Sequence, residues 1–306
     1  MSDIDSLLFP NDDRTQAEAA IAAVEAATVR HEAEHAGTRV VWRSAGQGSP
    51  LVLLHGGHGS WRHWIRNLEA LAQHHTVWVP DMPSFGESGT LTPPADLNHL
   101  VAATAATLDQ LVGADTPIDL AGFSFGGLCA VHLAARRGHV ARLALLGAAG
   151  HGTPRRQRAA MVNWRLASGE AALVEDLRHN LRALMLHDEH SIDALAVAVH
   201  RQACEATRFR SKALSQSSPT KGILDGFAMP ILFAWGEHDV TAHPDRVGPW
   251  WVDGRPERQW RVAAGVLRLR WCAACPIAQP PRCGRRHSRT VPATCRSGRP
   301  LLRYIL

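Results

Sequence analysis

The order of short apolar runs along the chain is the feature that most constrains its fold. From residue 38 onward, these runs alternate with segments of helical periodicity, a pattern typical of a mostly parallel β-sheet covered by helices on both faces. We therefore predict an α/β fold. The expected strands span residues 38–43, 51–54, 76–80, 118–123, 141–146, 230–235 and 259–265, and the expected helices span residues 96–112 and 126–137.

A long interruption of this alternation divides the predicted domain. Residues 151–227 are rich in Arg and Ala and show helical periodicity without a strand-like run. We interpret them as a helical cap over the strand ends, where open α/β sheets bind ligands; a lateral helical elaboration is the alternative. The core would then comprise residues 37–150 and 228–265. Residues 1–36 are predicted to form a helical extension, with a surface helix over residues 14–35.

Charge is distributed unevenly along the chain. The formal net charge is +5, yet the last 49 residues hold eleven arginines and neither a lysine nor an acidic residue. The first 257 residues carry 22 basic and 28 acidic side chains. This mildly acidic body gives no reason to expect nucleic-acid or membrane binding, and only the arginine-rich end could make such contacts. Because no secretory signal is recognisable among the first 30 residues, a cytoplasmic location is expected.

The strongest motif is Gly122-Phe123-Ser124-Phe125-Gly126. It lies where a predicted buried strand turns into a predicted helix, the context that a G-x-S-x-G nucleophile elbow requires. In that setting the Ser124 hydroxyl would stand above the sheet as a nucleophile. The backbone N–H of Phe125 would face a developing oxyanion at the start of the helix.

Two further segments supply the expected partners of Ser124. His55-Gly56-Gly57 follows another buried strand, and we assign the second oxyanion donor to the N–H of Gly57. His55 itself is expected to have a structural role. Asp239 follows the strand at residues 230–235 and is preferred over Glu237 as the acid that would orient a catalytic histidine. A helix cap or a turn is the structural alternative for Asp239.

These segments, together with Asp-Met-Pro-Ser-Phe-Gly-Glu-Ser at residues 81–88, resemble the α/β-hydrolase superfamily over residues 38–262. The resemblance implies an α/β-hydrolase fold and the chain order Ser, Asp, His for the catalytic residues. It implies a small-molecule substrate and neither a cofactor nor a metal ion.

Within the superfamily, residues 59–67 resemble the segment after the oxyanion loop of meta-cleavage-product hydrolases. Those enzymes hydrolyse carbon–carbon bonds in ring-fission dienoates. The family has asparagines where this chain has Phe123 and His63, and its carboxylate-binding cap arginine would correspond to Arg201. Apolar cap residues such as Met185 are candidates to shape a hydrophobic pocket, and a role in the cap's own core is the alternative.

The catalytic histidine of the family has no counterpart at the expected place. In the family it follows the glycine that ends the last strand, whereas Gly265 is followed here by Val266, and only His287 occurs beyond His243. Without a base, a serine hydroxyl is a poor nucleophile at neutral pH. Residues 266–306 thus form an atypical Arg-, Cys- and Pro-rich tail.

Three interpretations of this tail remain open. It could derive from a displaced reading frame or a truncation, or it could fold back so that His287 supplies the base. It could also be a zinc module, because its cysteines and His287 are zinc-ligand types, although their spacings match no common zinc finger. We therefore expect a serine hydrolase for small esters or carbon–carbon bonds, impaired if no base replaces the histidine. A non-catalytic, ligand-binding or degenerate hydrolase-like protein is the alternative.

Overall fold

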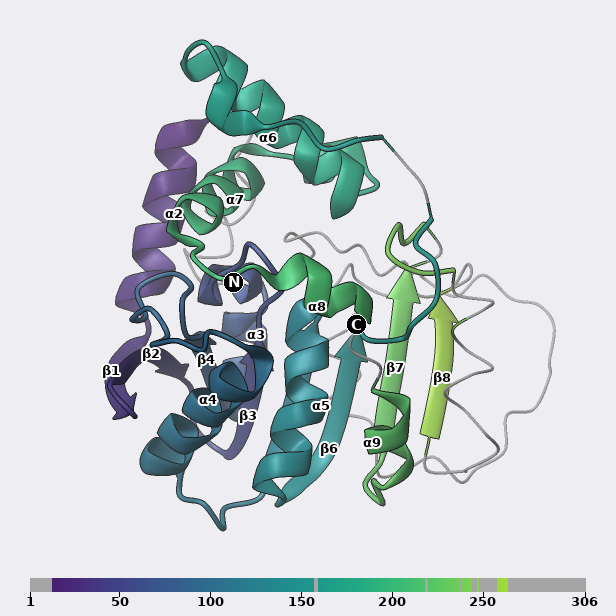
Figure 1. Ribbon diagram of the computed structural model, residues 1–306. Helices are drawn as coiled ribbons and strands as arrows, with labels where there is room; N and C mark the ends of the chain where they lie inside the picture. The colour runs from purple at the N-terminus through teal and green to yellow at the C-terminus, as the bar shows by residue number, and fades with distance from the viewer. Residues whose placement is uncertain are drawn as a thin grey trace, which may run out of the picture.

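A computed structural model of the chain describes residues 13–156, 159–217, 220–236, 238–243, 247 and 258–263. In this part of the chain a sheet of eight strands has the order β1-β2-β4-β3-β5-β6-β7-β8 (Figure 1). The β1–β2 and β2–β4 pairs are antiparallel, and the other neighbouring strands are parallel. The predicted α/β architecture with a mostly parallel sheet is therefore confirmed.

The predicted strands correspond to strands of the sheet, with small shifts at their ends. The strands are β1 (Val29–His35), β2 (Thr38–Ala45), β3 (Ser49–Leu54), β4 (His75–Asp81), β5 (Ile118–Phe123), β6 (Val140–Leu146), β7 (Ile231–Gly236) and β8 (Arg258–Ala263). The main helices are α2 (Arg14–Ala26), α3 (Leu68–Ala72), α4 (Leu97–Val112), α5 (Phe125–Arg137), α6 (Glu170–Leu184), α7 (Ala194–Ala206), α8 (Ser211–Ser217) and α9 (Lys221–Asp225). None of the helices in the described residues is long and apolar enough to cross a membrane.

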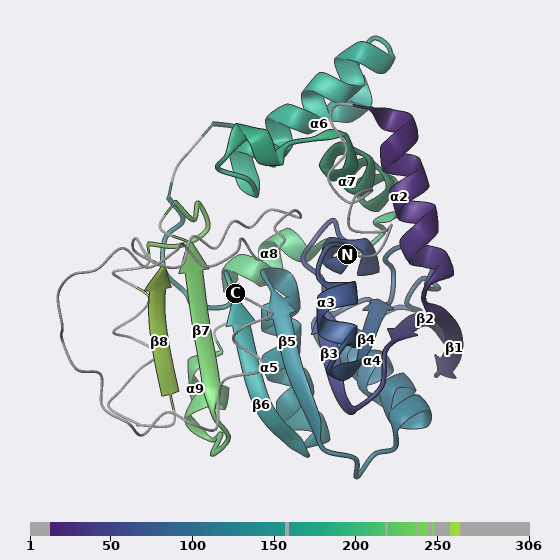
Figure 2. The ribbon, with the colours of Figure 1, turned by 180° about the vertical axis from the view of Figure 1, so that it is seen from behind.

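Helices pack on both faces of the sheet because alternate residues of each buried strand point to opposite sides. In β3, Val52 and Leu54 belong to the apolar cluster under α4 and α5. Leu51 and Leu53 belong to the cluster on the other face, which includes residues of α2 and α3. Figure 1 shows α4 and α5 in front of the strands, and Figure 2 shows α3 on the opposite side.

The expectation of one helix over residues 14–35 is wrong in its second half. Helix α2 ends at Ala26, and Val29–His35 forms the edge strand β1, paired with β2. Ala36 and Gly37 connect the two strands with φ angles of 48° and 76°, and positive φ at both positions is what a tight hairpin requires. The Ala- and Glu-rich composition favoured a helix, but cross-strand pairing with β2 decided the structure. The predicted helical extension of residues 1–36 therefore contains a strand of the core sheet.

The cap helices α6 and α7 lie above the carboxyl ends of the central strands (Figure 1). They share a small apolar core that includes Leu177, Leu181 and Ile192. The buried Arg66 forms an ion pair with Asp193 at the start of α7, which fastens the cap to the core. Helix α9, within the segment interpreted as cap, instead packs beside α5 on a face of the sheet.

Candidate active site

Ser124 lies at the junction between β5 and α5, as the elbow motif predicted. Its backbone has φ 53° and ψ −117°, a combination that residues other than glycine rarely adopt. The Ser124 N–H donates to the carbonyl of Leu146 at 3.0 Å. The Ser124 carbonyl accepts from the N–H groups of Gly127 at 3.0 Å and Ala149 at 2.9 Å. Hydrogen bonds from three neighbouring segments thus hold the strained backbone in place.

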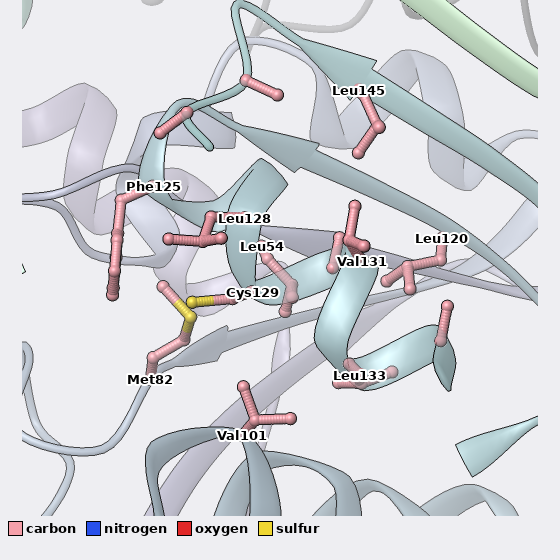
Figure 3. Packing of buried hydrophobic residues seen from close by; sticks show 14 of the residues in the cluster. Leu54, Met82, Val101, Leu120, Phe125, Leu128, Cys129, Val131, Leu133 and Leu145 are labelled. Atoms are coloured by element: carbon pink, nitrogen blue, oxygen red, sulfur yellow. The ribbon is translucent and has the colours of Figure 1, made fainter. Parts of the chain in front are cut away.

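The glycines of the elbow allow the backbone of α5 to approach the sheet closely. A Cβ atom on Gly122 would lie 2.3 Å from the carbonyl oxygen of Gly126. One on Gly126 would lie 2.3 Å from the carbonyl oxygens of Leu54 and His55. Both distances are shorter than a carbon–oxygen contact permits, so only glycine fits. Figure 3 shows Leu128 of α5 near Leu54 of β3 within the apolar cluster on this face of the sheet.

The loop after β3 packs against the elbow at the two expected positions. A Cβ atom on Gly56 would lie 3.4 Å from the Cβ of Ser124, and one on Gly57 would lie 3.7 Å from the Cβ of Phe125. Both residues assigned as oxyanion donors, Gly57 and Phe125, are therefore neighbours beside Ser124. This proximity is the arrangement that two converging N–H groups require.

His55 is buried and fixed by the backbone around it. The N–H of Met82 donates to Nε2 of His55 at 3.0 Å, so Nδ1 carries the proton and donates to the carbonyl of Gly56 at 2.8 Å. Burial lowers the pKa of His55 to about 4, which keeps the ring neutral at pH 7. The geometry agrees with the structural role expected for His55.

Asp239 follows β7 on the other side of the site. Its Oδ1 accepts hydrogen bonds from the N–H and from Oγ1 of Thr241, both at 2.7 Å. Its Oδ2 lies 3.1 Å from the position that a Cβ on Gly147 would take, which places the carboxylate against the end of β6. Burial raises the pKa of Asp239, and the two hydrogen bonds from Thr241 oppose that shift.

A pocket of about 360 Å³ opens between these elements, a size suited to a small molecule. Residues from the elbow, the segment after β6, helix α8 and the loop after β7 that carries Asp239 and Thr241 surround it. Its lining includes Ser124, Ala149, His151, Gly152, Thr153, Pro154, Arg155, Ser215, Gln216 and Thr241. Thr241 therefore connects the pocket of Ser124 with the carboxylate of Asp239.

His151 is a pocket residue that the sequence did not reveal. Its Nδ1 accepts from the N–H of Thr153 at 3.0 Å and contacts Oγ1 of Thr153 at 2.7 Å. Burial lowers the pKa of His151 to about 4, and a hydrogen bond to the Thr241 backbone opposes this shift. Through Thr153 and the Thr241 backbone, His151 joins the segment after β6 to the loop that carries Asp239. A lone histidine among glycines and alanines carries no motif that could have identified it.

Arg155 brings a positive charge to this pocket. Burial lowers the pKa of Arg155, and the nearby carboxylate of Asp239 opposes the shift. Arg201, the counterpart suggested for a carboxylate-binding arginine, instead forms ion pairs with Glu170 and Glu205 on the outside of the cap. In the part of the chain that the structure describes, no group of three or more His, Cys, Asp or Glu side chains could hold a metal ion.

Several predicted features lie outside the described residues. These are Glu237, the end of the last predicted strand at Gly265, and the tail with Val266 and His287. The absence of a histidine after Gly265 therefore remains an observation on the sequence.

Curated relatives match short parts of the chain. A pimeloyl-[acyl-carrier protein] methyl ester esterase of Xanthomonas campestris pv. campestris is 39% identical over 112 residues, which are 36% of this chain and 39% of the esterase. A 2-hydroxymuconate semialdehyde hydrolase of Pseudomonas sp. strain CF600 is 37% identical over 127 residues, or 39% of this chain and 43% of that hydrolase. The aligned parts thus span less than half of either relative.

The fold itself matches solved structures over a larger part of the chain. An esterase from Rhodococcus sp. ECU1013 superposes with a TM-score of 0.63 at 22% identity, covering 77% of this chain and 90% of the esterase. The sequence profile of the alpha/beta hydrolase fold family matches residues 49–265. This chain is accordingly a member of the α/β-hydrolase fold family.

Proposed function

We propose that the chain is a serine hydrolase that acts on a small ester or carbon–carbon bond substrate, with Ser124 as the nucleophile. The observation that carries the proposal is the backbone of Ser124, held at φ 53° between β5 and α5 at the edge of a pocket. A strained conformation is retained where the surrounding structure imposes it, and such positions are common in active sites. The family and the esterase and hydrolase relatives support the same class of reaction.

In the proposed reaction, Oγ of Ser124 forms a bond to the carbonyl carbon of the substrate. The negative charge that develops on the carbonyl oxygen is stabilised by the N–H groups of Gly57 and Phe125. The bond to the leaving group then breaks, and the leaving group departs with the proton that Oγ of Ser124 has lost. Water hydrolyses the acyl-serine intermediate in a second step.

Asp239 is proposed as the acid of the site. Its carboxylate is oriented by Thr241 at the pocket that contains Ser124. In the family an acid at this place stabilises a protonated histidine. Because Val266 follows Gly265 in this sequence, we propose that proton transfer from Ser124 is inefficient and that turnover is low.

The same departure from the family supports a second candidate function. A chain without an efficient base would act as a non-catalytic, ligand-binding or degenerate member of the family. The pocket and its Arg155 would then bind a small molecule without converting it.

Hydrolysis of p-nitrophenyl acetate in the presence and absence of free imidazole separates the two functions. For a serine hydrolase that lacks an efficient base, we expect slow release of nitrophenol that imidazole accelerates, and no acceleration in Ser124→Ala beyond the background reaction. Equal rates for the chain and Ser124→Ala at every imidazole concentration would overturn the enzymatic proposal. A fast reaction that needs no imidazole but is lost in His287→Ala would assign the base to the tail.

A further inference from the structure

A small apolar cavity lies between the core and the cap, separate from the pocket that contains Ser124. Its volume is about 30 Å³, enough for roughly two water-sized groups. Two residues of the core and six of the cap surround it. The lining consists of His63, Phe123, Leu181, Met185, Leu186, Ala196, Val199 and His200. Met185, for which the sequence left a pocket role and a core role open, lines this cavity and also packs against the apolar core of the cap.

The two histidines do not make this cavity a charged site. Burial lowers the pKa of His200 to about 4 and holds the pKa of His63 well below its ordinary value. Both rings are therefore neutral at pH 7. Nδ1 of His63 faces the N–H of Gly56 at 3.4 Å, so one wall of the cavity touches the oxyanion loop. A neutral lining dominated by aliphatic side chains favours an apolar group and disfavours an ion.

Phe123 stands between the cavity and the residues around Ser124. Its ring packs edge-on against His63, with 6.0 Å between the centroids. On another side, a Cβ on Gly56 would lie 3.1 Å from the ring. A Cβ on Gly147 would lie 3.8 Å from the Phe123 ring, and Gly147 also neighbours the Asp239 carboxylate. The ring thus reaches from the loop with Gly56 to Gly147 at the end of β6. In the sequence, Phe123 is the residue directly before the proposed nucleophile.

From this arrangement we infer that the cavity is the subsite for a short, unbranched aliphatic part of the substrate, and that Phe123 sets the length of chain it accepts. The identification of the ligand as a substrate rests on the proposed function, whereas the binding preference does not. Because Phe123 lines the cavity and directly precedes Ser124, a chain attached to the reacting carbonyl would have to pass the edge of this ring to reach the cavity. Removal of the six-carbon ring would join the cavity to the larger pocket.

Equilibrium binding of methyl ketones to Ser124→Ala tests this inference without any hydrolysis. The probes are 2-butanone to 2-decanone, which are neutral and cannot be cleaved. We expect the affinity to increase about fourfold per methylene while the cavity fills, and to become constant after about two or three carbons. In Ser124→Ala/Phe123→Ala the increase should continue for about three further carbons, so that 2-octanone binds at least about tenfold more tightly.

Two cap variants in the Ser124→Ala background check that the effect belongs to this cavity. Ala196→Phe fills it and should abolish the dependence on chain length, whereas Ala171→Phe on the exposed face of α6 should leave it unchanged. Val199→Ala enlarges the cavity and should raise the chain-length limit. It provides a second test if the bulky Ala196→Phe does not fold. An unchanged chain-length limit in both Phe123→Ala and Val199→Ala would overturn the inference. Failure of nitrophenyl ester hydrolysis alone would count against the proposed function only.

Discussion

The two sides of the pocket are held in place by different kinds of interaction. On the elbow side, Ser124 is held by backbone hydrogen bonds, and backbone atoms lie so close to Gly122 and Gly126 that neither position has room for a Cβ atom. On the acid side, Asp239 is fixed by hydrogen bonds from the N–H and from Oγ1 of Thr241, and His151 joins the segment after β6 to the same loop. The elbow side should therefore be sensitive to added volume, and the acid side to lost hydrogen bonds and to protonation.

Replacement of the nucleophile should have the largest effect. The measured rate is that of ester hydrolysis by the protein in the presence of imidazole, after the reaction of imidazole alone is subtracted. Ser124→Ala is expected to lower this rate by at least about 10³-fold, because no other group forms the acyl intermediate. Steady-state rates measure this loss. The exposed Ser168→Ala serves as the control and should retain the full rate.

Ser124→Gly offers an independent check on backbone strain. It should abolish activity as well, yet raise the free energy of unfolding by about 1 kcal/mol, because glycine adopts the φ of 53° without strain. Urea unfolding measures the change. A loss of stability in Ser124→Gly would contradict the strained elbow.

An added methyl group on the elbow side should be the most destabilising small change. Gly126→Ala is expected to lower the free energy of unfolding by about 3 kcal/mol, since its Cβ would meet two carbonyl oxygens at 2.3 Å. Gly222→Ala in α9 is the matched control, because a Cβ there has no neighbour within 4 Å. It should be neutral or slightly stabilising, as alanine is the better helix former. Similar losses in both variants would mean that close packing does not define the elbow.

Acid should destabilise the fold through its buried histidines. His55, His151 and His200 have pKa values of about 4 in the folded chain, below the ordinary 6.5. The unfolded chain thus binds more protons between pH 6.5 and pH 4, and the contribution of these groups to stability is lost as the pH falls through this range. The raised pKa values of Asp81 and Asp239 act in the opposite direction, because their contributions are lost as the pH rises.

The pH dependence can be assigned to a single group by mutation. Between pH 4 and pH 6.5, His151→Gln should remove up to one of the protons that the chain takes up on unfolding, and so flatten the dependence of the free energy of unfolding on pH. Over this range the difference is on the order of 3 kcal/mol. Denaturant unfolding at several pH values provides the slopes. An unchanged slope would show that His151 is not held neutral by burial.

The smallest effect on hydrolysis is expected at the hydrogen bond that orients the acid. Thr241→Val removes the Oγ1 donor to Asp239 and should lower the imidazole-stimulated hydrolysis about tenfold, corresponding to about 1.5 kcal/mol. Thr241→Ser keeps the hydroxyl and should restore most of the rate. If Thr241→Ser and Thr241→Val behave alike, the hydroxyl does not position the carboxylate.

The same contrast explains what could be predicted from the sequence. Steric demands appear as motifs, so the elbow at Ser124 and the glycines beside it were recognisable before the fold was known. Hydrogen bonds between loops leave no fixed spacing, and the parts played by His151 and Thr241 were therefore missed. Strand β1 was mistaken for helix because its Ala- and Glu-rich composition favours a helix, whereas pairing with β2 is a long-range contact that composition does not show.

Labelling by a fluorophosphonate probe, followed by mass-spectrometric mapping of the modified peptide, tests the central claim most directly. The account predicts that the phosphonyl group is attached to Ser124, slowly in buffer and faster with imidazole, and that Ser124→Ala takes up none. A folded chain whose Ser124 stays unmodified under both conditions, while a control serine hydrolase in the same tube is labelled, would contradict a nucleophilic Ser124.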